Sequence, residues 1–106
     1  MKRYNIESTI GGWFVGNFDK AAYKTEDFEV ALKEHYAGEI YQKHYHEYVT
    51  EINLVISGKI KVHNEVFEAG EIFILYPYEV ADPVFLEDCV IVCVKHPGIV
   101  NDKILL

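Results

Sequence analysis

The chain has 106 residues, a length that suits one domain with its own hydrophobic core. Its formal net charge is −7 and no basic stripe is visible, which argues against nucleic acid as a partner. No apolar run reaches the roughly 18 residues of a membrane-spanning helix, and no apolar stretch follows the basic residues near the start as in a secretion signal. We therefore expect a soluble cytoplasmic protein that binds neither nucleic acid nor membrane.

The first third of the chain contains two expected strands. Residues 9–16 indicate a turn followed by a short strand. Along residues 27–36 polar and apolar side chains alternate, and the apolar parity consists of Phe28, Val30, Leu32 and Tyr36. This alternation is typical of a half-buried strand. A helix is the competing interpretation, because the stretch also contains good helix formers.

The rest of the chain alternates short apolar runs with turns. Strands are expected at residues 41–46, 51–57, 60–62, 66–67, 72–75 and 89–94. Ser57-Gly58-Lys59 predicts a tight hairpin, and Pro77 ends a strand because proline cannot donate to a central ladder. Turns at intervals of about eight to twelve residues indicate an all-β fold, either an antiparallel sandwich or a small barrel. The tail over residues 99–106 is expected to pack on the outside or on a second subunit.

Cys89 and Cys93 are the only cysteines, and both lie in one apolar run. If this run is a strand, their α-carbons are about 13 Å apart, which exceeds the reach of a disulfide. We expect two buried free thiols in a reducing compartment.

The stretch from Gly38 to Gly58 contains candidate metal ligands. His44 and His46 are two residues apart, so both imidazoles point to the same face of an extended strand. Glu51 follows at the start of the next expected strand. Two neutral imidazoles and one carboxylate form the facial arrangement that holds a divalent metal and leaves coordination positions open. The alternative is a pair of surface histidines at a strand end.

The spacing in this stretch resembles a known family motif. Gly38, five residues, His44, one residue, His46, four residues, Glu51, six residues and Gly58 match the first motif of the cupin family. A second cupin motif is similar to Gly70-Glu71-Ile72-Phe73-Ile74 followed by Pro77.

This resemblance covers residues 38 to about 83 and implies a cupin fold, a small antiparallel β-barrel or jelly roll with the ligand site inside. It implies one cupin domain over residues 1–106, with the core barrel at about 26–96 and the N-terminal strand and C-terminal tail packed outside. It also implies that His44, His46 and Glu51 hold one divalent transition metal, which is Fe, Mn, Zn or Ni.

The second motif departs from the cupin pattern after Pro77. Glu79 replaces the usual glycine, and Asp82 stands where the family has its fourth ligand, a histidine. Three roles are open for Asp82: metal ligand, general base or turn former, since Asp before Pro is common in loops.

Other polar residues near the motif are candidates for contact with a substrate. Asn53 lies two residues after Glu51 and shares its face, so it is a candidate substrate-binding or ligand-orienting residue; a structurally bonded amide is the alternative. Tyr41 and Tyr76 flank the site. Packing is one role for each, but a tyrosine at a barrel mouth also acts as acid, base or sugar-stacking surface. We take Tyr41 as a candidate catalytic residue and Tyr76 as a candidate substrate contact.

A metal in such a site chelates adjacent substrate oxygens and acidifies a neighbouring C–H or O–H bond. The small cupins that this chain resembles are often associated with sugar and polysaccharide metabolism. The sequence therefore indicates an isomerase- or epimerase-like enzyme with a small carbohydrate-type substrate. Two alternatives stay open, an Fe(II)-dependent dioxygenase and a non-catalytic sugar- or metabolite-binding module. A homodimer is expected, since small cupins commonly pair through their sheets.

Overall fold

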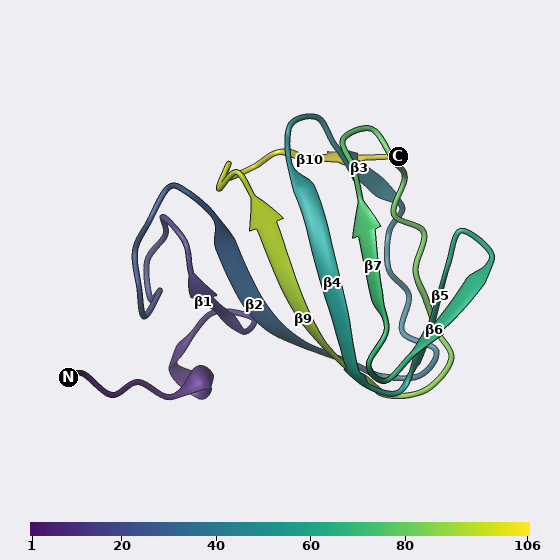
Figure 1. The fold of residues 1–106 in the computed structure, drawn as a ribbon, viewed down its shortest axis with the longest axis horizontal. Coiled ribbons are helices and arrows are strands. Elements are labelled where there is room, and N and C mark those ends of the chain that lie inside the picture. The colour runs from purple at the N-terminus through teal and green to yellow at the C-terminus, as the bar shows by residue number, and fades with distance from the viewer.

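The computed structural model describes residues 1–106, and nearly all of its ordered elements are β-strands (Figure 1). One 3₁₀ turn, η1 (Ile6–Ser8), precedes them. The strands are β1 (Trp13–Val15), β2 (Glu29–His35), β3 (His44–His46), β4 (Thr50–Ser57), β5 (Lys59–Val62), β6 (Glu65–Glu68), β7 (Ile72–Leu75), β8 (Val84–Phe85), β9 (Cys89–His96) and β10 (Lys103–Leu105). The expected all-β antiparallel fold is confirmed. None of its helical turns has the length and hydrophobicity needed to cross a membrane.

The strands form three antiparallel sheets. The largest has the order β1-β2-β9-β4-β7, while β3 pairs with β10 and β5 lies between β6 and β8. Figure 1 shows the five-stranded sheet as one curved wall, with β5 and β6 at the end farthest from β1 and with β3 and β10 across the top in this view.

Strand register aligns side chains in rows across the large sheet. One row consists of Ala31, Cys93, Asn53 and Phe73. The next row on the same face consists of Glu29, Lys95, Glu51 and Leu75. Because alternate residues of a strand share a face, both rows point to one side. Most members of these rows are buried, so this side is the interior of the barrel.

The side of β2 that faces the barrel interior carries the polar residues of its alternating pattern. Glu29 and Ala31 are buried, and Lys33 continues their face, whereas the flanking Phe28 and Tyr36 are exposed. The alternation correctly predicts a strand here. Antiparallel sheets usually bury the apolar side, but this interior holds polar groups and the pattern is therefore inverted.

The prediction of a hairpin at Ser57-Gly58-Lys59 is wrong. β4 pairs with β7 and β9, whereas β5 pairs with β6 and β8, so the chain changes sheets at Gly58. Gly58 has a φ of +87°, and a Cβ atom there would lie 2.1 Å from the carbonyl oxygen of Asp88. Only glycine fits this corner, because the two backbones approach too closely for a side chain.

The C-terminal segment is part of the barrel. In the β3–β10 pair, Lys103 lies opposite His46 and Leu105 lies opposite His44. The tail therefore does not pack on the outside as expected, but continues the sheet that contains the histidines.

An apolar cluster fills the barrel between β4, β5, β8 and β9. Its buried members are Val55, Ile60, Val62, Leu75, Ala81, Phe85, Cys89 and Ile91. Both cysteines are buried and free, as expected. Burial of this cluster anchors the scaffold on which the polar residues are placed.

Candidate metal centre

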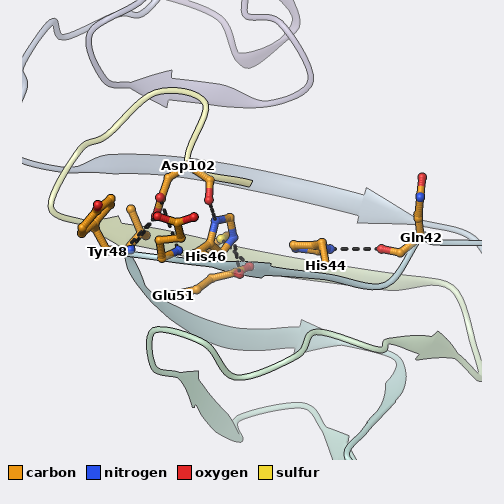
Figure 2. A network of polar contacts seen from close by, with 9 residues as sticks. Gln42, His44, His46, Tyr48, Glu51 and Asp102 are labelled. Carbon is orange, nitrogen blue, oxygen red and sulfur yellow. Dashed lines mark hydrogen bonds and ion pairs between the residues drawn. The ribbon is translucent and has the colours of Figure 1, made fainter. Parts of the chain in front are cut away.

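Two short strands bring the predicted ligands together. His44 and His46 lie on β3 and are each 5% exposed, and Glu51 lies near the start of β4. One possible donor atom from each of these three residues lies within 4.8 Å of the others. In Figure 2, His46 lies between Glu51 and the Asp102 segment.

Backbone carbonyls orient both imidazoles. Nδ1 of His44 lies 3.0 Å from the carbonyl oxygen of Gln42, and Nδ1 of His46 lies 3.3 Å from that of Asp102 (Figure 2). Because a carbonyl oxygen only accepts, each Nδ1 carries the proton and each Nε2 keeps a free lone pair. This is the tautomer that a metal-binding histidine needs.

His46 and Glu51 face each other across a gap that suits a cation. Nε2 of His46 lies 3.4 Å from Oε2 of Glu51, and both buried atoms lack a hydrogen-bond partner. Two lone-pair atoms at this distance repel unless a proton or a metal cation lies between them. A divalent metal satisfies both, since imidazole and carboxylate are ordinary ligands for it. The residues present therefore fit a metal ion.

Electrostatics favour the protonation states of Glu51 and His44 that a metal needs. Burial raises the pKa of Glu51, but His46, the charge of Lys95 and the Cys93 thiol outweigh it and bring this pKa to about 2. Burial lowers the pKa of His44. At neutral pH Glu51 is therefore ionised and His44 is neutral, as metal binding requires.

A buried carboxylate that no local sequence pattern reveals supports the turn between β3 and β4. The side chain of Asp102 accepts hydrogen bonds from the backbone N–H groups of Glu47, Tyr48 and Val49, at 2.9 to 3.3 Å. Its main-chain carbonyl holds His46. Asp102 thus connects the segment before β10 to the ligand strand.

The structure places Asp82 outside the ligand group. Oδ1 of Asp82 accepts a hydrogen bond from the N–H of His63 at 3.0 Å, which ties its loop to the β5–β6 turn. The preceding residue, Ala81, is buried and forms an antiparallel bridge with His44. Neighbouring residues of an extended chain point to opposite faces, so Asp82 points out where Ala81 points in. Of the three roles open to Asp82, this geometry supports the turn former.

Asn53 and Tyr41 line a cavity together with His44 and Glu51, whereas Tyr76 does not. Asn53 is 5% exposed, and its Nδ2 has no acceptor. The ring centre of Tyr41 lies 5.7 Å from that of His44. Burial raises the pKa of the Tyr41 hydroxyl, and so does the charge of Glu51. Tyr76 is 57% exposed and follows β7 directly.

Cys93 contacts the ligand set directly. Its Sγ donates a hydrogen bond to Oε1 of Glu51 at 3.3 Å. Burial raises the pKa of the Cys93 thiol well above its usual value, and the charge of Glu51 adds to this effect. The thiol therefore stays protonated and keeps its hydrogen bond to Oε1 of Glu51. Oε2 is the carboxylate oxygen that is left free to bind a metal.

The site opens into a cavity inside the barrel. Most of the residues that line this cavity are hydrophobic, with a few polar groups among them, as is usual for a ligand site. Trp13 from β1 forms part of its wall, so the N-terminal strand contributes to the site. Three lysines on β2, β9 and β10 also line it, namely Lys33, Lys95 and Lys103. Their strands are distant in sequence, and only the register brings these side chains together.

The sequence matches no protein-family profile and no curated protein. Several solved structures are similar. An uncharacterized conserved protein with a double-stranded β-helix domain from Klebsiella pneumoniae is 28% identical, and the match covers 76% of this chain and 71% of that one with a TM-score of 0.68. KdgF from Halomonas sp. is 22% identical over 73% of this chain and 74% of its own, with a TM-score of 0.66.

A cupin protein from Bacteroides fragilis is also similar, at 22% identity over 76% of this chain and 72% of its own, with a TM-score of 0.60. These structures share the β-architecture described above. The chain therefore has the fold of a small cupin domain, the double-stranded β-helix.

Proposed function

We propose that this protein is a metal-dependent enzyme with isomerase- or epimerase-like chemistry on a small carbohydrate-type substrate. The observation that carries the proposal is the pair of buried atoms without partners, Nε2 of His46 and Oε2 of Glu51, with His44 beside them. Three protein ligands leave positions free for substrate oxygens. When bound, an Fe, Mn, Zn or Ni ion supplies Lewis acidity that polarises a substrate oxygen and acidifies the adjacent bond.

The neighbouring residues supply orientation and a proton. Nδ2 of Asn53 is a free donor in the cavity, so we assign it to a substrate oxygen. The Tyr41 hydroxyl keeps its proton at neutral pH, because burial raises its pKa. We therefore assign Tyr41 as a proton donor to the substrate. The resemblance of the sequence to cupins of sugar metabolism supports a carbohydrate-type ligand.

The metal content of the purified protein tests the site. Protein prepared without chelators or nickel resin is expected to contain about one equivalent of a transition metal by elemental analysis, because three preorganised ligands bind tightly. The double variant His44→Ala/His46→Ala should contain almost none. His96→Ala removes an exposed histidine outside the cavity and should retain the metal. Equal metal content in all three proteins would contradict the site.

The reaction is tested separately by NMR in D₂O. Metal-loaded protein is expected to introduce deuterium next to the carbonyl of an aldose or uronic acid, as proton transfer during isomerisation requires. Oxygen uptake that depends on added Fe(II) would instead favour the dioxygenase. Sugar binding without turnover that survives in the His44→Ala/His46→Ala variant would favour a binding module.

We also propose that the protein works as a cytoplasmic homodimer. Its two buried free thiols suit a reducing compartment. The outer face of the large sheet is aliphatic, and such faces commonly pair with a second copy.

A further inference from the structure

The cavity is positively charged inside a chain that is acidic overall. The net charge of the chain is −7, yet Lys33, Lys95 and Lys103 line the cavity and Glu51 is the one carboxylate in its wall. A bound divalent metal adds further positive charge. A cavity with this excess of cations attracts anions.

Two of these lysines lie next to the proposed metal ligands. Lys95 on β9 is the cross-strand partner of Glu51 on β4, and Lys103 on β10 is the partner of His46 on β3. Directly opposed residues have Cβ atoms about 5 Å apart and share a face. Both lysine side chains therefore start beside a proposed ligand, and both line the same cavity.

Aromatic rings position the lysine side chains. Nζ of Lys95 lies 4.8 Å from the centre of a Trp13 ring, and Nζ of Lys33 lies 5.8 Å from that ring. Nζ of Lys103 lies 4.9 Å from the ring centre of Tyr41. Such contacts hold an ammonium group in place without neutralising its charge.

No carboxylate of the protein pairs with these three cations. The only lysine that forms ion pairs is Lys59, on β5. Lys95 lies between Glu29 and Glu51 in the register but contacts neither carboxylate, and Lys33 donates to the carbonyl of Gly11 at 3.2 Å. Burial lowers the pKa of Lys103, and the positive charge of Lys95 lowers it further. The ammonium groups of these two lysines therefore repel each other.

We infer that the substrate carries an anionic group, a carboxylate or a phosphate, which binds between Lys95 and Lys103 beside the metal ligands. Lys33 adds to the charge, and the unpartnered Nδ2 of Asn53 adds a buried hydrogen-bond donor to the same wall. The sugar part of this substrate rests on the proposed function. The anionic group follows from the lysines alone.

Three ligands that differ only at C6 provide the test: glucose, glucuronate and glucose 6-phosphate, together with the corresponding galactose series. Binding to metal-loaded protein is measured by calorimetry at low and high salt. At least one anion is expected to bind about tenfold or more tightly than its neutral sugar, since hydrogen bonds between charged groups are the strong ones. The preferred anion distinguishes carboxylate from phosphate. High salt should reduce the preference, because exposed charges are screened.

Lysine variants locate the anion site. Lys95→Met and Lys103→Met keep the aliphatic stem and should each reduce the anion preference about tenfold. Lys61→Met on β5 changes the net charge equally but lies outside the cavity, so it should have no effect. Metal content is measured in every variant. Metal-loaded protein that binds no anion more tightly than its neutral sugar, or lysine variants that match Lys61→Met, would overturn this inference and leave the metal site standing. Absence of metal from the wild-type protein would overturn the proposed function itself.

Discussion

The proposed ligands depend on side chains that lie behind them. Asp102 shows this most clearly, because its buried carboxylate accepts three backbone hydrogen bonds from the turn that joins β3 to β4. Its removal leaves those N–H groups without an acceptor and loosens the strand that carries His44 and His46.

Asp102→Ala is expected to lower the free energy of unfolding by about 3 kcal/mol or more, since each buried unsatisfied group costs about 1–3 kcal/mol. Metal affinity should fall roughly 10- to 100-fold, as for other residues that orient ligands. Urea denaturation and competition with a chelator measure the two effects. Asp27→Asn, at an exposed position, is the control and should change neither. A variant as stable as this control would show that the turn holds without Asp102.

Cys93 is expected to position Glu51 through its thiol. Cys93→Ala removes the hydrogen bond to Oε1 and should weaken metal binding about tenfold. Cys93→Ser keeps a donor and should lose less. Cys89→Ala is the matched control, because that buried thiol donates only to the carbonyls of Lys59 and Glu87. Titration against a chromophoric chelator compares the variants, and identical affinities for the two alanine variants would contradict the role of Cys93.

At the level of strands and turns, two glycines with the same backbone conformation have different surroundings. Gly58 and Gly70 both have a φ of +87°, but a Cβ atom at Gly58 would meet the carbonyl of Asp88 whereas one at Gly70 would meet nothing within 4 Å. The sheet change at Gly58 therefore requires a residue without a side chain. The turn at Gly70 requires only the backbone freedom of glycine.

Gly70→Ala is expected to cost about 1–2 kcal/mol, the usual penalty for a left-handed residue. Gly58→Ala should cost clearly more, because strands from two sheets must also move apart. Chemical denaturation of both variants gives the difference directly. Equal losses would mean that the corner relaxes freely.

Local patterns predict the strands and the three ligands well, because strand alternation and motif spacing act over a few residues. His44, His46 and Glu51 meet as their spacing predicts. Asp82 illustrates the limit, since a position in a motif does not determine which way a loop residue points. Asp102, Lys95 and Lys103 depend on strand pairings between distant segments, which no local pattern encodes. The sequence around Gly58 predicts a hairpin because a change of sheet uses the same residue type as a tight turn.

At the scale of the whole molecule, the outer face of the large sheet lacks cover. Ile72 and Ile74 on β7 are 59% and 39% exposed, and Ile52 and Leu54 on β4 are their cross-strand partners. An aliphatic face of this kind is typical of an interface between proteins.

Light scattering is therefore expected to give about twice the chain mass of 12.3 kDa. Ile72→Glu should convert this dimer into a monomer, because a charge buried at the interface lacks a partner. Val84→Glu changes a residue that is 50% exposed on β8, in another sheet, and should leave the dimer intact. A monomeric wild-type protein would remove the proposal of a dimer.

The bond between Nδ1 of His46 and the carbonyl of Asp102 joins residues that are 56 positions apart. Ribosomes synthesise roughly 5–20 residues per second, so several seconds separate the appearance of this histidine from that of the residue that orients it. Until then β3 lacks its neighbour β10, and the tautomer of His46 is not fixed. The arrangement of the three proposed ligands is thus completed late in biogenesis, only when the segment that contains Asp102 has been made.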